Sequence, residues 1–289
     1  MAKPLAGMRI AICGKGGSGK STFVTLMARV LREKGYRVHV LDGDASNPGL
    51  YRMLGFEKAP EPLIDFYGGK FFSGGKVTCP VDDPTPLQRG EINLDELPRK
   101  YFVKSGGLTF FRVGKIESAL EGCSGPESKV VRDFKIPGDH VTLIDLVAGV
   151  EHFARGVEIN VDGVIAIIDP TSTSLELAKR IKDMVENMKR GTEPATAHLE
   201  EAADIEMIKK LAKGARVKYL WVVLNKIRSS RIESLMTRKL KEYGIEPIGS
   251  VREDAEVLES SLEGVPLRGS GAKKDVGKIV DRLEELVAG

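Results

Sequence analysis

The sequence is poor in cysteine and has no excess of one charge. It carries only three cysteines, Cys13, Cys79 and Cys123, which are too few and too scattered for a disulfide framework. The 44 Lys and Arg residues oppose 41 Asp and Glu residues, and both signs are mixed along the chain. This balance gives no support to an electrostatic nucleic-acid binder, so we expect no nucleic-acid partner.

Long apolar runs are also missing. No stretch approaches the roughly 20 apolar residues that span a bilayer, and no signal-peptide pattern opens the chain. The last residues form an amphipathic helical pattern, but its polar face mixes Asp275, Glu284 and Lys278 and is not the cationic face that anionic lipid favours. We therefore expect a cytoplasmic protein without a stable membrane anchor, whose C-terminal helix packs against the rest of the fold.

What the chain does contain is an alternation of short β-branched runs with longer helical patterns. Helices are predicted over Lys20 to Glu33 and Ser172 to Lys189, where apolar residues recur at helical spacing. Strands are predicted at Met8–Cys13, Arg37–Asp42, Thr109–Gly114, Val141–Leu146, Gly163–Ile168, Lys218–Leu224 and Glu246–Ser250. The alternation predicts an α/β fold, with a doubly wound, mostly parallel sheet and helices on both faces.

Two segments interrupt this alternation. Residues 68–107 are rich in Gly and Pro with weak periodicity, and a long irregular excursion of this kind is usually functional or mobile. Residues 189–216 are a charged insertion with a small helix predicted from about His198 to Lys213, which can also be a solvated decoration. Neither a repeat nor a linker is evident, so a single domain over residues 1–289 is predicted.

The most specific motif lies in "ICGKGGSGKST". Gly14, Gly19, Lys20 and Ser21 fit the pattern G-x-x-x-x-G-K-[ST], which here follows a predicted strand and opens a predicted helix. Such a loop cradles phosphates with its backbone N–H groups, while the lysine reaches the outer phosphates and the serine binds Mg²⁺. We expect the whole loop to bind ATP or ADP: Gly14, Lys15, Gly16, Gly17, Ser18, Gly19, Lys20, Ser21 and Thr22.

The additional Lys15 in "KGGSGKST" resembles the deviant Walker A motif of the family that includes MinD, ParA and the nitrogenase iron protein. The resemblance implies that Lys20 serves its own nucleotide, whereas Lys15 reaches the phosphates of a partner subunit. A cation delivered across an interface stabilises charge that develops in phosphoryl transfer, as an arginine finger does. The resemblance thus implies a homodimer in the ATP state and a Mg²⁺-dependent ATPase.

Further residues that match functional positions of this family follow in chain order. The resemblance assigns Asp44 in "VLDGDASNPGL" to orienting the attacking water, and Asp42 to the Mg²⁺ shell or to structure, although carboxylates at a strand end can also cap a turn. Asp145 ends an apolar strand, as a Walker B carboxylate must to meet Mg²⁺. Gly149 can offer its N–H to the terminal phosphate. Asn225, with Lys226, resembles the base-recognising Asn of the family, although Asn is common in strand-end turns.

Within this family, the stretches "DLVAGVEHFARG", "VDGVIAIIDPTSTSLELAKRI" and "EGCSGPESKVVRDF" are similar to the nickel-insertion ATPase that matures carbon monoxide dehydrogenase. Those relatives carry Cys-x-Cys, which by the resemblance forms a metal site shared between two subunits. Here Cys123 is followed by Ser124 and Gly125, so the second thiolate is missing from the motif. Cys123 is either an ordinary loop residue or a ligand for Ni²⁺ or Zn²⁺, with Cys79 as a candidate helper. His152 is expected to be a switch-region or packing residue.

The sequence therefore predicts an ATP-driven homodimeric switch that acts on a client metalloenzyme, in nickel insertion of the carbon monoxide dehydrogenase type or a related maturation. The alternative is a spatial or partition regulator of the MinD or ParA kind.

Overall fold

The computed structural model describes residues 3–47, 49–114, 116 and 122–289. The predicted stretch that begins at Glu121 is thus described only from Gly122 on. The strands, in chain order, are β1 (Arg9–Gly14), β2 (Val38–Asp42), β3 (Val103–Ser105), β4 (Leu108–Arg112), β5 (Val141–Asp145), β6 (Gly163–Ile168), β7 (Tyr219–Ile227) and β8 (Gly249–Arg252).

These strands form one eight-stranded sheet in the order β3-β4-β2-β5-β1-β6-β7-β8. All neighbouring pairs are parallel except the pair of β3 with β4 at one edge. Strand β1 lies between β5 and β6, with Ile12 opposite Asp145 and Gly14 opposite Ile167. The register brings the carboxyl ends of β1, β2 and β5 together at one edge, where parallel sheets place their ligands. The predicted fold class is confirmed.

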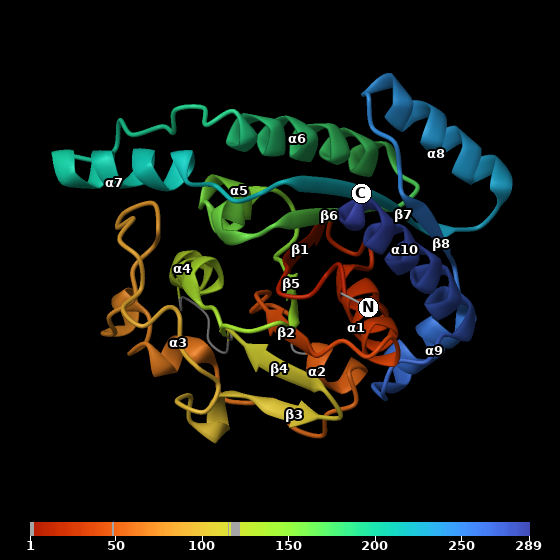
Figure 1. Ribbon diagram of the computed structural model, residues 1–289, viewed down its shortest axis with the longest axis horizontal. Helices are drawn as coiled ribbons and strands as arrows, with labels where there is room; N and C mark the ends of the chain where they lie inside the picture. The colour runs from red at the N-terminus through yellow and green to blue at the C-terminus, as the bar shows by residue number, and fades with distance from the viewer. Residues whose placement is uncertain (1–2, 48, 115, 117–121) are drawn as a thin grey trace.

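Helices cover both faces of this sheet (Figure 1). They are α1 (Lys20–Glu33), α2 (Leu50–Met53), α3 (Leu63–Phe66), α4 (Gly125–Asp133), α5 (Glu151–Ala154), α6 (Ser172–Lys189), α7 (Ala202–Lys213), α8 (Ser230–Glu242), α9 (Ala255–Glu263) and α10 (Ser270–Ala288). Short 3-10 turns η1 (Phe71–Ser73), η2 (Arg99–Tyr101) and η3 (Val157–Asn160) complete the set.

Two apolar cores result, one on each face of the sheet. One core joins α1 and α10 through side chains such as Phe23, Leu31 and Val280. The other joins α4, α6 and α8 through side chains such as Val130, Ile181 and Leu240. The five apolar positions that predicted the first helix are all buried: Phe23, Leu26, Met27, Val30 and Leu31.

The C-terminal helix α10 packs onto α1 and β8, and its side chains Val276, Ile279 and Leu283 are buried there. Its apolar face is therefore part of the core, as the mixed charges of its other face predicted. None of the described helices is both long and apolar enough to cross a bilayer.

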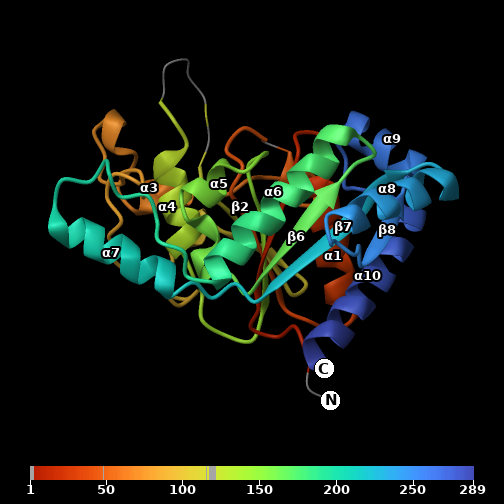
Figure 2. The same ribbon diagram turned by 90° about the horizontal axis from the view of Figure 1, so that it is seen from above.

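Several boundaries differ from the prediction. Strand β8 begins at Gly249 and not at Glu246. Helix α7 begins at Ala202 and not at His198, because residues 196–199 form a turn in which the N–H of Leu199 donates to the carbonyl of Thr196 at 3.0 Å. The edge strand β3 was not predicted, since its three residues pair only with β4. Helix α7 has no buried residue and lies along one border of the molecule (Figure 2).

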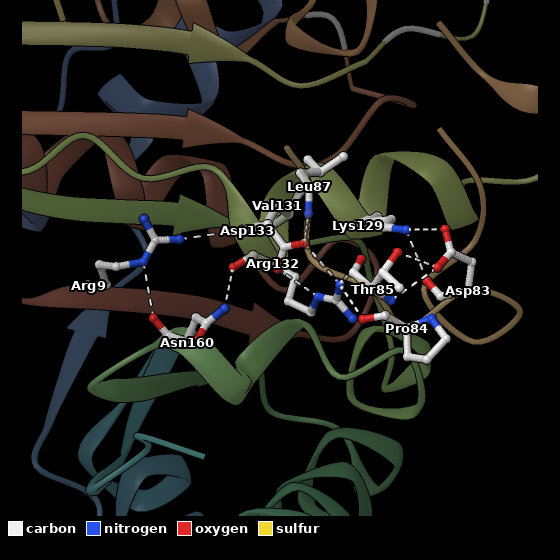
Figure 3. A network of polar contacts seen from close by, with 10 residues as sticks. All are labelled: Arg9, Asp83, Pro84, Thr85, Leu87, Lys129, Val131, Arg132, Asp133 and Asn160. Carbon is white, nitrogen blue, oxygen red and sulfur yellow. Dashed lines mark hydrogen bonds and ion pairs between the residues drawn. The ribbon is translucent and has the colours of Figure 1, made fainter. Parts of the chain in front are cut away.

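The excursion over residues 68–107 is irregular, as predicted, but it is tied to α4 by polar contacts (Figure 3). The ammonium group of Lys129 donates to the Oδ2 atom of Asp83 at 2.6 Å, and the guanidinium of Arg132 donates to the carbonyl of Thr85 at 3.2 Å. The N–H of Leu87 donates to the Oδ2 atom of Asp133 at 2.9 Å. These contacts hold the excursion against the helix that follows Cys123.

Candidate nucleotide site

The predicted phosphate loop connects β1 to α1 at the carboxyl edge of the sheet. Gly14 has a φ of 148°, and a Cβ atom on it would lie 2.5 Å from the carbonyl oxygen of Ile167. Gly19 has a φ of 97°, and a Cβ atom on it would lie 2.3 Å from the side-chain nitrogen of Asn225. Both positions need glycine, because a side chain would be strained and would collide with the neighbouring strands.

A cleft of about 1,010 Å³ opens beside this loop. It brings together most of the residues predicted from the sequence: Gly16, Gly17, Gly19, Lys20, Ser21, Thr22, Asp44, Asn225 and Lys226. Lys20 is buried, and its ammonium group lies 3.5 Å from the carbonyl oxygen of Lys15, so it is folded back over the loop. The cleft joins this cationic loop to residues of β8 and α9, among them Val251 and Leu258.

At the bottom of the loop, Ser21 meets Asp145. The hydroxyl of Ser21 donates to Oδ2 of Asp145 at 2.5 Å and accepts a bond from the side-chain amide of Asn47 at 2.9 Å. Oδ1 of Asp145 is buried and has no hydrogen-bond partner among the described residues. Burial raises the pKa of Asp145 to about 7, against the opposing effects of Ser21 and Lys20. An unpaired buried carboxylate oxygen beside a serine hydroxyl suits a divalent cation.

Two further carboxylates extend this acidic corner. Asp42 is buried, and desolvation, with the nearby charge of Asp145, raises its pKa well above the usual range. Its Oδ1 atom accepts the N–H of Asp44 at 3.2 Å. Asp44 is only half-buried and lines the cleft, where its Oδ1 atom accepts the N–H of Ser46 at 3.0 Å. Asp44 therefore both caps a turn and lines the cleft.

The segment after β5 returns to the phosphate loop. The N–H of Gly149, which the sequence assigns to a terminal phosphate, donates here to the carbonyl of Gly14 at 3.1 Å. The ring of His152 is buried, with Nε2 2.9 Å from the carbonyl oxygen of Gly149 and Nδ1 against Glu158. His152 therefore positions this segment from the inside, in agreement with its interpretation as a switch-region or packing residue.

Lys15 points away from the cleft. Its ammonium group lies 3.3 Å from Oδ2 of Asp169 and 3.2 Å from the hydroxyl of Thr171. Burial raises the pKa of Asp169, but bonds from Ser174, Thr171 and Lys15 outweigh it and lower that pKa. Lys15 also borders a groove of about 760 Å³ between the phosphate loop and α6. The two loop lysines thus face different surfaces.

Asn225 and Lys226 bind the loop from β7. The amide of Asn225 donates to the carbonyl of Ser18 at 2.7 Å, and the ammonium group of Lys226 donates to the carbonyl of Gly17 at 2.7 Å. Lys226 has a φ of 57°, which turns its side chain back toward the loop. In this structure both residues support the loop backbone, and a role for Asn225 in base recognition stays a prediction.

Sequence analysis missed two residues of the site. Asn47 holds Ser21, and Asp169 holds Lys15. Both stand in stretches noted for other reasons, "DASNPGL" and "IIDPTSTS", directly after strands that end at the site edge. Their position after a strand was the available signal.

Cys13, Cys79 and Cys123 are not among the residues that line the nucleotide cleft. Cys123 is exposed, Cys79 is half-buried, and Cys13 is buried inside β1. Within the described ranges, no group of three or more His, Cys, Asp or Glu side chains is arranged to hold a metal ion.

Comparison with known proteins agrees with this geometry. The family described as the CobQ/CobB/MinD/ParA nucleotide binding domain matches residues 10–267. An uncharacterized ATP-binding protein of Methanocaldococcus jannaschii is 31% identical over 96% of this chain and 98% of its own. The carbon monoxide dehydrogenase accessory protein CooC of Rhodospirillum rubrum is 29% identical over 63% of this chain and 70% of its own.

Among solved structures, the septum site-determining protein MinD of Pyrococcus horikoshii, in complex with Mg-ADP, superimposes with a TM-score of 0.61. The match covers 98% of this chain and 97% of that one at 17% identity, so it concerns the fold alone.

Proposed function

Since the chain belongs to the CobQ/CobB/MinD/ParA nucleotide-binding family, we propose that it is an ATP-hydrolysing dimeric switch in the maturation of a metalloenzyme. The observation that carries this proposal is the pair of loop lysines, with Lys20 folded over the phosphate cradle and Lys15 turned to an outer groove. Lys20 already supplies the cation of the cradle, so Lys15 is available for a phosphate outside its own loop.

Mg²⁺ with ATP or ADP is the ligand that fits the cleft. Ser21 and Asp145 would hold the cation, and the free Oδ1 atom of Asp145 gives it a carboxylate ligand. Asp42 is a further carboxyl group buried in the same corner. A Mg²⁺ ion held by these residues would neutralise charge on the phosphate oxygens.

Asp44 is the residue that we assign to the attacking water. It lies at the end of β2, beside the acidic corner, and reaches the cleft while Asp42 and Asp145 stay buried. A half-exposed carboxylate at this place can accept a hydrogen bond from water and orient it toward a terminal phosphate. Lys15 of a second subunit would then stabilise the charge that develops on the phosphate.

The proposed dimer requires Lys15 to leave its own Asp169. The side chain of Lys15 is 33% exposed, so the exchange needs no opening of the core. A partly exposed ion pair of this kind contributes roughly 0–1 kcal/mol to stability. A charge-assisted bond from Lys15 to a phosphate group in a second subunit can offset its loss. Dimer closure and nucleotide binding are thereby coupled through one side chain.

The client is proposed to be a metalloenzyme, in nickel insertion of the carbon monoxide dehydrogenase type or a related maturation. The similarity to CooC over 70% of that protein supports this assignment. Two relatives among shorter matches are described as an iron–sulfur cluster carrier protein and a cytosolic Fe-S cluster assembly factor, which also concern metal centres.

A capture experiment tests this function. The Asp44→Ala protein, loaded with ATP and Mg²⁺, is incubated with extract of the native cells, and bound proteins are identified by mass spectrometry. We expect an enzyme with a metal centre to be enriched over a Lys15→Ala control. Recovery of cell-division or partition proteins instead would favour the spatial regulator, as would ATP-dependent co-sedimentation with liposomes or DNA.

A further inference from the structure

We propose that Cys79 and Cys123 of one protomer form a two-thiolate site for a thiophilic metal ion. The inference deepens the proposed function, on which its biological meaning rests, by naming the residues that handle the metal. The two cysteines are 44 positions apart in the sequence, and the second lies directly before α4. Their convergence is a feature of the tertiary structure.

The surroundings of Gly125 show that the sulfur atoms of Cys79 and Cys123 lie close together. A Cβ atom built on Gly125 would lie 2.8 Å from Sγ of Cys79 and 3.3 Å from Sγ of Cys123. Both distances start at the same point, so the sulfur atoms are no more than about 6 Å apart, while two bonds of about 2.3 Å to one tetrahedral ion join sulfurs roughly 4 Å apart. A rotation of one exposed side chain closes this difference.

The same distances show what replaces the missing motif residue. A cysteine at position 125 would complete the Cys-x-Cys pattern, but Gly125 has no side chain. The sulfur of Cys79 occupies the space into which a side chain at 125 would project. This chain therefore supplies its second sulfur from the excursion and keeps glycine at 125 to make room for it.

The excursion is held firmly enough to keep Cys79 in place. The N–H of Asp83 donates to the carbonyl of Cys79 at 3.0 Å, and the hydroxyl of Thr78 donates to Oδ2 of Asp83 at 2.9 Å. That carboxylate is bound by Lys129 of α4, whose side chain is only 4% exposed (Figure 3). A second ion pair joins Lys70 to Glu127 at 2.7 Å, where both side chains are buried. Buried, charge-assisted contacts fix geometry better than exposed ones.

A short series of contacts connects this pair to the nucleotide site. Gly149 is bonded to the phosphate loop through Gly14, and α5 follows it directly. From the end of α5, the guanidinium of Arg155 donates to the hydroxyl of Ser124 at 3.2 Å. Ser124 is the neighbour of Cys123, so a shift of the Gly149 segment reaches the sulfur pair through one side chain.

The two thiol groups determine how the site would bind a metal ion. Each loses its proton when it binds the ion, so uptake of one divalent ion releases up to two protons. Thiolate sulfur favours Ni²⁺ and Zn²⁺ over Mg²⁺, which keeps this site distinct from the nucleotide site. Two sulfurs leave two positions of a tetrahedral ion open, as a site that must pass its ion onward requires.

Metal titration of the full-length, reduced and tag-free protein tests the proposal. Ni²⁺ and Zn²⁺ are the ions to bind, and Co²⁺ serves as a probe because thiolate coordination gives it intense near-ultraviolet absorption. Without nucleotide, we expect one ion per protomer and at least a tenfold loss of affinity in both Cys79→Ser and Cys123→Ser. The Cys13→Ala variant is the matched control, since Cys13 is buried in β1 and should not contribute.

An exchange variant makes the test specific. Cys79→Gly alone should lose the ion, and Cys79→Gly combined with Gly125→Cys should regain it, because the sulfur then returns from the other backbone. Binding that survives in Cys79→Ser would overturn the site, and so would binding that appears only with ATP at one ion per two protomers. Thermal melting and MgATP affinity establish that each variant is folded.

The result also separates this site from the proposed function. If no ion binds while ATP-dependent dimerisation and client capture persist, the sulfur site is wrong and the switch stands. If the ion binds but ATP has no effect on dimerisation, the switch is wrong and the sulfur site stands.

Discussion

The ammonium group of Lys15 lies 3.3 Å from the Oδ2 atom of Asp169 in the same chain. Asp169 follows β6, whereas Lys15 follows β1, and these two strands are neighbours in the sheet. The contact holds the lysine on the outer side of the loop, at the groove toward α6. If Lys15 acts on another subunit, as we propose, this contact keeps its side chain at the surface and off its own phosphate cradle.

The first prediction concerns this lysine. Lys15→Ala should keep nucleotide affinity within about threefold, because Lys20 and the loop backbone remain, but should fail to form the ATP-dependent dimer. Light scattering with ATP and Mg²⁺ measures the change in mass. Lys179→Ala is the control, since Lys179 borders the same groove outside the loop. Normal dimerisation of the Lys15 variant would refute its role in trans.

The second prediction concerns Lys20. Its removal takes away the buried cation of the cradle, so Lys20→Ala should weaken MgATP binding at least a hundredfold, or about 2.7 kcal/mol. Isothermal calorimetry gives the affinity. Lys34→Ala, at the far end of α1 and paired with Asp281 and Glu284, should bind as the wild type does. Retention of wild-type affinity in Lys20→Ala would contradict the nucleotide assignment.

The third prediction separates hydrolysis from binding. Asp44→Ala should bind ATP and dimerise, yet release phosphate roughly 10²–10⁴ times more slowly, because the group that orients water is lost. Phosphate release at saturating ATP is the measurement. The defect differs in kind from that of Lys15→Ala, and an Asp44→Ala protein with normal turnover would remove Asp44 from the mechanism.

The fourth prediction concerns acid stability. Burial raises the pKa of Asp83, but bonds from Lys129, Thr85 and Thr78 outweigh it and lower that pKa to about 2. The folded-state pKa lies below the unfolded value near 4, so the stabilisation is complete above pH 4 and is lost as the pH falls toward 2. We expect about 1 kcal/mol for this half-exposed group.

Thermal melting of wild type and Asp83→Asn between pH 2 and 6 checks this expectation. The variant should be less stable than the wild type near pH 6, and the difference should shrink toward pH 2. A difference that stays constant over the whole range would mean that the charge of Asp83 has no part in holding the excursion.

The sequence was informative where a motif is local. Lys20 and Ser21 share one loop, so their spacing fixed their place at the start of α1. The apolar runs before Asp42 and Asp145 predicted that each residue lies at the end of a strand. The prediction was weaker where tertiary contacts decide. The antiparallel pairing of β3 with β4 is an example, because the three residues of β3 have no other partner strand.

Contacts between residues far apart in the chain leave no recognisable pattern in the sequence. The bond between Asp169 and Lys15 spans 154 positions, and the place of Cys79 beside Gly125 depends on how the excursion folds onto α4. The sequence suggested Cys79 as a helper only because it lies in an irregular segment. That the sulfur of Cys79 lies beside Gly125 could be found only from the three-dimensional structure.

The nucleotide cleft and the cysteine pair are bordered by different helices. The cleft is bordered by α9, whereas the pair lies beside α4, and the two helices are well separated in both views (Figures 1 and 2). If a client docks at the cysteine pair, as the proposed function and the proposed metal site together imply, it would leave the α9 border of the nucleotide cleft uncovered.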